Sequence, residues 1–517
     1  MQSILLLTLS LFLIYVSRKL LGFWGAVRAI QNHPGQRFLV SNSSILGILL
    51  PKIRGVTSGR SHLFENKHEP FAAAGWDIHS SITIFPDGRT TIVLADAAAI
   101  KEVTSSRSRF PKPVHNYKAL SFYGHNIVAS EGEEWKKYRK ISAPAFSDRN
   151  NKLVWVETVK IVQGLFQDVW KDREVIHVDH CLDITLPIAL FVIGAAGFGR
   201  SIRWDEDSMI PPGHQMTFKD ALNVVTTEIV IKVFVPKWAM GLTERFRKVR
   251  LAFVELQSYM LEMIRERENA EKIERDDLFS SLLAANEYGQ DGNTLSESEV
   301  IANIYMFLVA GHETTAHTLS FTFALLALYP DEQEKLYEHI RSVVPKGREA
   351  TYEEMPLLTY AMAVFYETLR MFPPGTSIPK VAAEDTSLVA SNSHGEQITV
   401  PIPKGTAVII STPGIHYNPR YWDDPHAFKP ARFLKDWPRE AFLPFSAGAR
   451  ACLGRKFFET EGIATLTMLV SHYKITIKEE PQFAGESFEQ RKKRVLAARV
   501  ALTLKPTRVP LTFTRRV

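Results

Sequence analysis

The sequence predicts a mainly α-helical protein with small β-sheets, an α+β arrangement, preceded by one apolar helix at the N-terminus. Long stretches after residue 150 carry apolar residues at helical spacing, and short β-branched runs flank turn residues near residue 86. Residues 4–16 are almost wholly apolar. The 517 residues are 45% hydrophobic and 23% charged, which is enough apolar material for one large core.

Charge and cysteine content narrow the class of protein. The formal net charge of +6 is mild and spread along the chain, so it favours a membrane surface or an acidic protein partner and predicts no nucleic acid partner. Two cysteines exclude a disulfide framework and fit a reducing compartment such as the cytosol.

The apolar N-terminus predicts a signal anchor. Residues 1–17 are at the short end for a spanning helix, and the thin endoplasmic reticulum bilayer accepts that length. A cleaved signal peptide would have its positive charge before the apolar run, whereas Arg18 and Lys19 follow it. We therefore expect a single-pass transmembrane anchor over 1–17, a juxtamembrane hinge segment over 18–60, and one cytosolic domain over 61–517. On this topology the glycosylation sequon at Asn42 lies on the cytosolic side and is never exposed to the lumen.

The first part of the domain is expected to hold a hairpin and two helices. Ser81 to Phe85 and Thr90 to Leu94 are β-branched runs around a Pro-Asp-Gly turn. Asp96 is placed to cap a helix through Val103. A loop over 110–127 follows, and then a helix over 133–139 on which Trp135 and Arg139 share a face.

Residues 153–267 show helical periodicity with few breaks, chiefly at Pro211 to Gly213 and near Pro236. Residues 224–235 are apolar enough to touch a membrane, and Cys181 is expected in the core. The charge run over 265–277 predicts a solvated helix end and loop.

A long buried helix is predicted from the Ser296–Glu299 capping box to Tyr329, where Pro330 stops it. Its middle is the segment Ala310-Gly311-His312-Glu313-Thr314-Thr315. A mid-helix glycine costs about 1 kcal/mol relative to alanine, and a buried glutamate is unfavourable unless paired. An acid and an alcohol within one turn provide a proton relay. A zinc-protease helix is excluded because His312 and His317 are five residues apart, so both histidines are expected to be core or groove residues.

Two further motifs follow. Glu367 and Arg370 lie three apart on a helix predicted over 359–370, and Pro430-Ala431-Arg432-Phe433 lies downstream. The stretch from Phe445 to Gly454 then places Cys452 among glycines, with Arg450 two residues away. A Gly-rich turn presents backbone N–H groups to a thiolate, which favours a single axial metal ligand beside an anionic cofactor. From the residues alone, a buried loop cysteine remains the alternative.

The pattern Phe-x-x-Gly-x-Arg-x-Cys-x-Gly, with Phe445, Gly448, Arg450, Cys452 and Gly454 at its fixed positions, resembles the haem-binding loop of the cytochromes P450. The resemblance covers nearly the whole chain after about residue 60 and is strongest to membrane-bound (microsomal) fungal members. It implies the P450 fold, haem b as cofactor and Cys452 as the axial thiolate ligand of the haem iron. It also implies that Arg450, Trp135 and Arg139 face the haem propionates.

The same resemblance assigns the other motifs. Ala310 and Gly311 would open a groove for O2, Thr314 would hold reduced oxygen and water, and Glu313 would link that water to a proton supply. Glu367, Arg370 and Arg432 would form a buried triad that steadies the cysteine loop. The family often has arginine where this chain has Lys380, so a propionate contact there is not assigned.

We therefore expect a membrane-anchored haem-thiolate monooxygenase of the endoplasmic reticulum. It would oxidise a lipophilic small molecule, such as a terpenoid or another secondary metabolite, with electrons from NADPH through a separate cytochrome P450 reductase. Arg455 and Lys456 are expected near that reductase, and Phe307, Ala310, Thr376, Ser377 and Ile378 are expected to line the substrate pocket. The alternatives are a P450-fold isomerase or dehydratase that uses no O2, and a non-catalytic haem-binding membrane protein.

Overall fold

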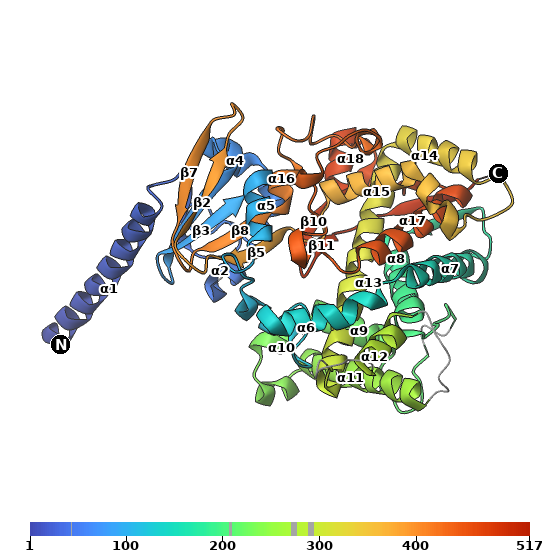
Figure 1. Cartoon of the computed structure of the whole chain (residues 1–517), viewed down its shortest axis with the longest axis horizontal. Coiled ribbons are helices and arrows are strands. Elements are labelled where there is room, and N and C mark those ends of the chain that lie inside the picture. The colour runs from blue at the N-terminus through green and yellow to red at the C-terminus, as the bar shows by residue number, and fades with distance from the viewer. Residues whose placement is uncertain (43, 206–208, 270–276, 288–293, 517) are drawn as a thin grey trace.

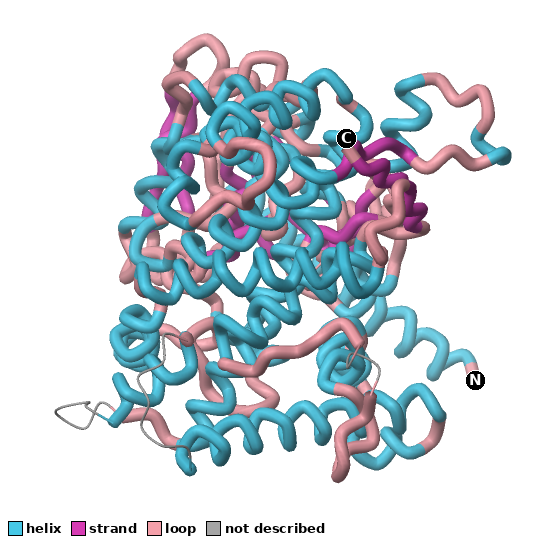
Figure 2. Tube along the Cα trace, turned by 90° about the vertical axis from the view of Figure 1, so that its right-hand side faces the viewer, coloured by secondary structure: helices cyan, strands magenta, loops and turns pink. Residues whose placement is uncertain are grey.

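The structure is a computed structural model that describes residues 1–42, 44–205, 209–269, 277–287 and 294–516. Helices make up most of the body, the strands gather mainly on the side nearest the N-terminus, and α1 (Gln2–Ala29) extends away from both (Figure 1). Figure 2 shows from a second direction that strands occupy only the upper half of that view, while the lower half is helices and loops. The predicted mainly helical architecture with small sheets is confirmed.

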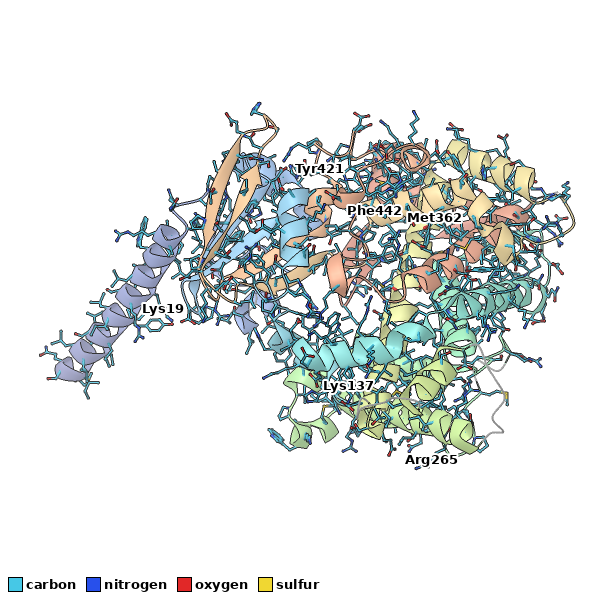
Figure 3. The ribbon with its side chains drawn as sticks, viewed as in Figure 1. Lys19, Lys137, Arg265, Met362, Tyr421 and Phe442 are labelled. Carbon is cyan, nitrogen blue, oxygen red and sulfur yellow. The ribbon has the colours of Figure 1, made fainter. Side chains whose placement is uncertain are left out.

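The N-terminal helix is longer than the predicted apolar segment, because it continues without a break to Ala29. Its apolar first part is 0% buried, and its last turn packs against the body through Val27. Lys19, labelled in Figure 3, donates to the Asp87 carboxylate at 3.0 Å, and so ties the helix to the turn of the first hairpin. A Cβ on Gly88 of that turn would lie 2.5 Å from the carbonyl of Gly22, so the two backbones touch.

The main sheet has the strand order β1-β2-β3-β8-β5. The predicted hairpin is confirmed: β2 and β3 pair antiparallel, with Thr83 opposite Arg89. The helix α5 follows, and the Asp96 side chain accepts from the N–H of Ala99 at 3.0 Å, as its sequence position predicts. The strands of this sheet are β1 (Gly35–Val40), β2 (Ile78–Phe85), β3 (Arg89–Leu94), β5 (Ser377–Val381) and β8 (Ala407–Ser411).

Three smaller sheets complete the strands. They pair β4 (Val175–Val178), β12 (Leu511–Arg515) and β9 (Tyr473–Ile477); β6 (Thr386–Ser391) and β7 (Gln397–Ile402); and β10 (Ala498–Val500) and β11 (Leu504–Pro506). The strand β4 interrupts the region predicted as helical over 153–267. Its alternation covers only four residues, which is too short to stand out among the flanking helices.

The helical body supplies the remaining elements. They are α2 (Ile45–Leu49), α3 (His62–Asn66), α4 (Glu69–Ala74), α5 (Ala97–Ser105), α6 (Gly132–Ser142), α7 (Asp148–Gly164), α8 (Leu182–Val192), α9 (Phe218–Thr227), α10 (Ile229–Phe234), α11 (Glu244–Asn269), α12 (Leu278–Glu287), α13 (Glu297–Leu328), α14 (Pro330–Val343), α15 (Thr359–Met371), α16 (Thr412–His416), α17 (Arg455–His472) and α18 (Phe488–Val495). The loop predicted over 110–127 contains one 3-10 turn at Val114–Leu120. Most of the predicted charged loop, 270–276, lies outside the described residues.

The long helix α13 runs through the centre of the body and is mostly buried (Figure 1). The capping box is formed as predicted, with the Ser296 hydroxyl accepting from the Glu299 N–H and the Glu299 carboxylate accepting from the Ser296 N–H. Helices α8, α15 and α17 pack against it. Cys181, His312 and His317 are buried, which confirms their expected core positions.

Candidate active site

A cavity of about 430 Å³ is lined by residues from the middle of α13 and from the loop that precedes α17. This cavity brings together most of the residues that the sequence motifs single out. Its lining includes Ala310, Gly311 and Thr314 from α13, Trp135 and Arg139 from α6, and Phe445, Arg450, Cys452 and Gly454 from the loop.

The loop before α17 has a shape that requires glycine. Gly448 adopts φ +66°, and a Cβ there would lie 2.4 Å from the carbonyl oxygen of Thr104 in α5. The loop closes on itself where the Cys452 N–H donates to the Phe445 carbonyl at 2.8 Å. These two constraints fix the backbone on either side of the thiol.

The Cys452 thiol retains accessible surface because it faces the cavity. The protein around it desolvates the sulfur and raises the pKa of the thiol; the Gly454 N–H and the guanidinium groups of Arg139 and Arg455 act in the opposite direction. A thiolate here would need a further positive partner inside the cavity, and a metal ion is such a partner.

Trp135, Arg139 and Arg450 form one wall of the cavity. Two guanidinium groups lie over the Trp135 ring, with the Arg107 carbon 4.4 Å and the Arg450 carbon 4.3 Å from its centroid. Arg450 also pairs with the Glu131 carboxylate at 2.8 Å, and Arg139 donates to the Ala451 carbonyl at 2.9 Å. The helix α6 is thereby attached directly to the cysteine loop.

Two lysines add to the positive charge of this wall. Lys112, which the sequence did not single out, lines the cavity, and burial followed by the charge of Arg450 lowers its pKa to about 7. Lys380 also lines the cavity and is 4% exposed, and burial lowers its pKa. The Glu131 carboxylate acts on Arg450 and on both lysines. The wall therefore has a surplus of buried positive charge, which suits a ligand with more than one anionic group.

Helix α13 contributes a further part of the cavity lining. Ala310, Gly311 and Thr314 face the cavity, and a Cβ at Gly311 would lie 3.2 Å from Ile193. The Thr314 hydroxyl donates to the Ala310 carbonyl at 2.7 Å, so its oxygen can accept a hydrogen bond from a group in the cavity. Glu313, one residue earlier, does not line the cavity; it is buried, and burial raises the pKa of its carboxyl.

The predicted triad is formed. Glu367 and Arg370 are fully buried and make two hydrogen bonds, from Nε to Oε2 at 2.7 Å and from Nη2 to Oε1 at 2.9 Å. Arg432 donates from Nε to Glu367 Oε1 at 3.1 Å. Arg370 also donates to the carbonyls of His416 and Pro425, both at 2.8 Å. Because these charges are desolvated, every hydrogen bond in the cluster is needed to offset the cost of burial.

His416 is a residue that sequence reasoning missed. Its Nδ1 contacts the Arg370 carbonyl at 3.0 Å, and the Leu443 N–H donates to its Nε2 at 2.8 Å. Nε2 must therefore be the acceptor and Nδ1 the protonated nitrogen. Burial and the Arg370 charge lower its pKa to about 3, which keeps this neutral form. A lone histidine in a loop gives no sequence signal of such a bridge.

Comparison with known proteins identifies the fold family. The sequence pattern described as "Cytochrome P450" matches residues 67–496. The chain belongs to the cytochrome P450 family. It is 56% identical over 521 residues to "Cytochrome P450 monooxygenase 124" of Postia placenta, covering 100% of both chains. It is 31% identical to "Cytochrome P450 monooxygenase ORF6" of Penicillium roqueforti, covering 74% of each.

A solved structure supports the fold of this P450 independently. The "cytochrome P450DA heme domain" superposes with a TM-score of 0.73 at 23% identity, covering 94% of this chain and 98% of that one. Membership makes the chain a P450 monooxygenase that uses haem, receives electrons from a reductase and acts on a small molecule. The apolar α1 and the fungal relatives fit a membrane-anchored enzyme.

The cavity fits haem. Its lining combines a soft sulfur donor with small residues, and a wall with surplus buried cations suits the two propionates of this cofactor. Lys380, left unassigned from the sequence, belongs to that wall.

Proposed function

We propose that this P450 inserts an oxygen atom from O2 into a lipophilic small molecule, with Cys452 as the axial ligand of haem b. One observation carries the proposal: Cys452 lines the same cavity as Ala310, Gly311 and Thr314, together with several cationic side chains. Haem, when bound, supplies the redox-active iron that activates O2. The remaining roles belong to the side chains of this chain.

The cationic wall would hold the cofactor. Arg450, Trp135 and Arg139 would bind the propionates, with Lys112 and Lys380 as additional charged partners. Phe445, Gly448 and Gly454 would shape the loop, since glycine permits the close approach to α5 and Phe445 packs on Phe458 at 5.5 Å. The triad of Glu367, Arg370 and Arg432 would hold in place the segment that precedes the cysteine loop.

Thr314 and Glu313 would handle protons. The Thr314 oxygen would accept a hydrogen bond from a donor in the cavity, because the Thr314 hydroxyl donates its own hydrogen to the Ala310 carbonyl. The buried Glu313 carboxyl, whose pKa is raised by burial, is one residue away and would supply a proton through water. Replacing Thr314 with alanine should raise peroxide formation per NADPH consumed; unchanged coupling would remove this role for Thr314.

The substrate is proposed to be apolar, such as a terpenoid or another lipophilic secondary metabolite. Phe307, Ala310 and Ile378 line the cavity, together with Ile127 and Met306. Ser377 also lines it, whereas Thr376 does not belong to the lining. Spectral titration with a panel of terpenes, followed by product analysis, tests this substrate class. A strict preference for charged or strongly polar compounds would exclude it.

We further propose that residues 1–17 anchor the protein in the endoplasmic reticulum membrane, with 18–60 as connecting segment and 61–517 as cytosolic catalytic domain. Exposed apolar side chains at Phe234 and Trp238 offer a second membrane contact. The Asn42 side-chain amide donates to the Gly59 carbonyl at 3.3 Å, and its oxygen accepts from the Thr57 hydroxyl at 2.8 Å. A glycan on the amide nitrogen would disturb these hydrogen bonds. Membrane fractionation and protease protection test the orientation, which a glycan on Asn42 would overturn.

Electrons are proposed to come from NADPH through a separate reductase. Lys456 is exposed at the start of α17, beside Arg455, and neither residue belongs to the cavity lining. Replacing Lys456 with glutamate should slow reduction at low salt if the reductase presents acidic groups. An unchanged rate at low salt would place the docking surface elsewhere.

The decisive experiment for the whole proposal is the carbon monoxide difference spectrum of reduced full-length protein. A thiolate-ligated haem gives a strongly red-shifted Soret band, which should vanish in a Cys452→Ser variant. Folded, haem-loaded wild-type protein without this band would overturn the proposed function.

A further inference from the structure

A buried asparagine on α13 holds the loop that precedes α6. The Asn303 side chain is fully buried. Its Oδ1 accepts from the backbone N–H of Ile127 at 2.9 Å, and its Nδ2 donates to the Glu299 carbonyl of its own helix at 2.7 Å. A backbone N–H only donates and a backbone carbonyl only accepts, so these two partners fix the orientation of the Asn303 amide.

The loop residue that Asn303 holds lines the active-site cavity. Ile127 belongs to the lining, whereas Asn303 is not among the lining residues. The Ile127 carbonyl accepts from Nη1 of Arg450 at 3.3 Å. A single loop residue is therefore bonded through its N–H to α13 and through its carbonyl to the cysteine loop.

The shape of this loop is fixed from within. Asn126 is fully buried, and its Oδ1 accepts from the N–H groups of Val128 at 3.1 Å and Ala129 at 2.9 Å. The loop also approaches α13 closely, because a Cβ on Gly124 would lie 3.2 Å from the Ser298 carbonyl. Asn126 thus determines the form of the loop, and the Asn303 bond determines where that form stands against α13.

We propose that Asn303 is a positioning residue that controls how bulky apolar ligands fit the cavity. By holding the Ile127 N–H, it sets how far the Ile127 side chain enters the space beside the cofactor. The inference rests on the proposed function, because it concerns ligands bound next to haem. It gives a specificity role to a residue that none of the sequence motifs includes.

The cationic wall has support of its own and does not depend on Asn303. Arg450 pairs with the Glu131 carboxylate at 2.8 Å and donates to the Ser130 carbonyl at 2.6 Å, and both contacts are shorter than its contact with Ile127. Loss of the Asn303 amide should therefore leave haem bound and displace the part of the lining that Ile127 forms.

Asn303→Leu removes the acceptor at nearly constant size. The Ile127 N–H would then be buried without a partner, which is unfavourable, so the loop should shift until that group reaches another acceptor or water. The Ile127 side chain moves with its own backbone. The variant should keep the red-shifted carbon monoxide band, because Cys452 and the contacts of Arg450 with Glu131 and Ser130 are untouched.

The first readout is azole binding to haem-loaded full-length protein, measured by optical titration. Imidazole is a small iron ligand, and 4-phenylimidazole adds an apolar ring that must fit the cavity. In Asn303→Leu the Kd of 4-phenylimidazole should rise about three- to tenfold relative to the Kd of imidazole, the range expected from one lost hydrogen bond. A ratio equal to that of wild type overturns the inference.

Gln333→Leu is the matched control. Gln333 is a buried amide on α14 that donates to the Ile475 carbonyl at 2.8 Å and accepts from the Ile475 N–H at 2.8 Å. Neither residue lines the cavity. Gln333→Leu should lower the thermal midpoint and leave the ratio of the two azole Kd values unchanged. A change in the ratio as large as that in Asn303→Leu would indicate general loosening and would overturn the inference.

A double-mutant cycle tests whether Asn303 acts through Ile127. Ile127→Ala alone should weaken 4-phenylimidazole binding, because it removes apolar contact from the lining. The same change in the Asn303→Leu background should have little further effect, since Ile127 has already left its position. Additive effects of the two substitutions would overturn the inference.

The last readout requires neither activity nor a variant. Hydrogen exchange resolved to single amides in wild-type protein should show the Ile127 N–H exchanging at least about tenfold more slowly than that of His125, an exposed residue of the same loop. Equal rates overturn the inference, and this measurement decides the matter if Asn303→Leu does not fold. Failure of the proposed function looks different: wild-type protein then lacks the red-shifted carbon monoxide band, while Ile127 exchange remains measurable.

Discussion

The backbone N–H of Leu443 donates to Nε2 of His416 at 2.8 Å, and the other ring nitrogen of His416 contacts the carbonyl of Arg370 at 3.0 Å. One imidazole thus connects the helix that carries the triad to the segment that leads into the cysteine loop. The glutamate–arginine cluster and the thiolate loop are positioned together through this ring.

Replacing His416 with phenylalanine should weaken that connection. The N–H of Leu443 and the carbonyl of Arg370 would both lose a buried partner, at a cost on the order of 2–4 kcal/mol. We expect a lower thermal midpoint and less haem per polypeptide. The exposed His394 provides the control, because His394→Phe should leave both quantities unchanged. Full haem content in His416→Phe would show that the loop does not need the bridge.

Gly448→Ala should prevent the cysteine loop from closing. The positive φ disfavours any L side chain, and the new Cβ would lie 2.4 Å from the Thr104 carbonyl, which is backbone and cannot rotate away. We expect loss of the thiolate carbon monoxide band in protein that keeps its helical circular dichroism. Gly241→Ala is the control, because a Cβ there meets nothing within 4 Å.

Glu461 should make the protein less stable as pH rises. It is fully buried in α17, and neither carboxyl oxygen has a donor among the described residues, since the nearby Thr315 hydroxyl donates to Gly311 at 2.9 Å. Burial raises its pKa well above 4.5. Below pH 4.5 folded and unfolded chains both hold the proton; above it only the unfolded chain ionises, which favours unfolding.

Glu461→Gln should therefore stabilise the protein at pH 8, by about 1–3 kcal/mol, and have little effect at pH 4. Denaturant unfolding at the two pH values measures this difference. Glu459→Gln should instead destabilise the protein at pH 8, because the Glu459 carboxylate accepts hydrogen bonds from Arg455 at 2.8 Å and from Tyr366 at 2.6 Å. Equal effects of Glu461→Gln at both pH values would contradict the argument.

Glu299 should contribute to stability above its unfolded pKa. Burial opposes ionisation, but the Ser296 N–H, the Tyr138 hydroxyl and the Lys137 ammonium outweigh it and lower the pKa from 4.5 to about 2. Lys137 lies on α6 (Figure 3), so this cluster joins α6 to the start of α13. The contribution is complete above pH 4.5 and is lost as pH falls toward 2.

Glu299→Gln should lower the free energy of unfolding at pH 7 by at most about 3 kcal/mol and have little effect near pH 2. The exposed Glu297, in the same helical turn, is the control. Acid titration of unfolding in both variants measures the difference, and a loss that is as large at pH 2 would show a packing effect instead.

Short-range motifs were the predictable part of this protein. The Asp96 cap, the Ser296 capping box and the Glu367–Arg370 pair involve residues three apart, so their spacing indicates their contact. Resemblance of the motifs then indicated the family, which the comparisons confirm. The strand β4 and the full length of α1 were not predicted, since both depend on packing against distant segments.

By itself the sequence determined which chemical groups are present: a thiol in a glycine-rich turn, an acid beside an alcohol, and an apolar N-terminus. Only the tertiary structure decided that Lys112 and Lys380 share one wall with Arg450, and that His416 bridges to Leu443. These partners lie far apart along the chain, and no fixed sequence interval relates them. Folding brings these residues together in the interior. Each buried polar group then needs a hydrogen-bond partner there, because burying an unpaired polar group is unfavourable.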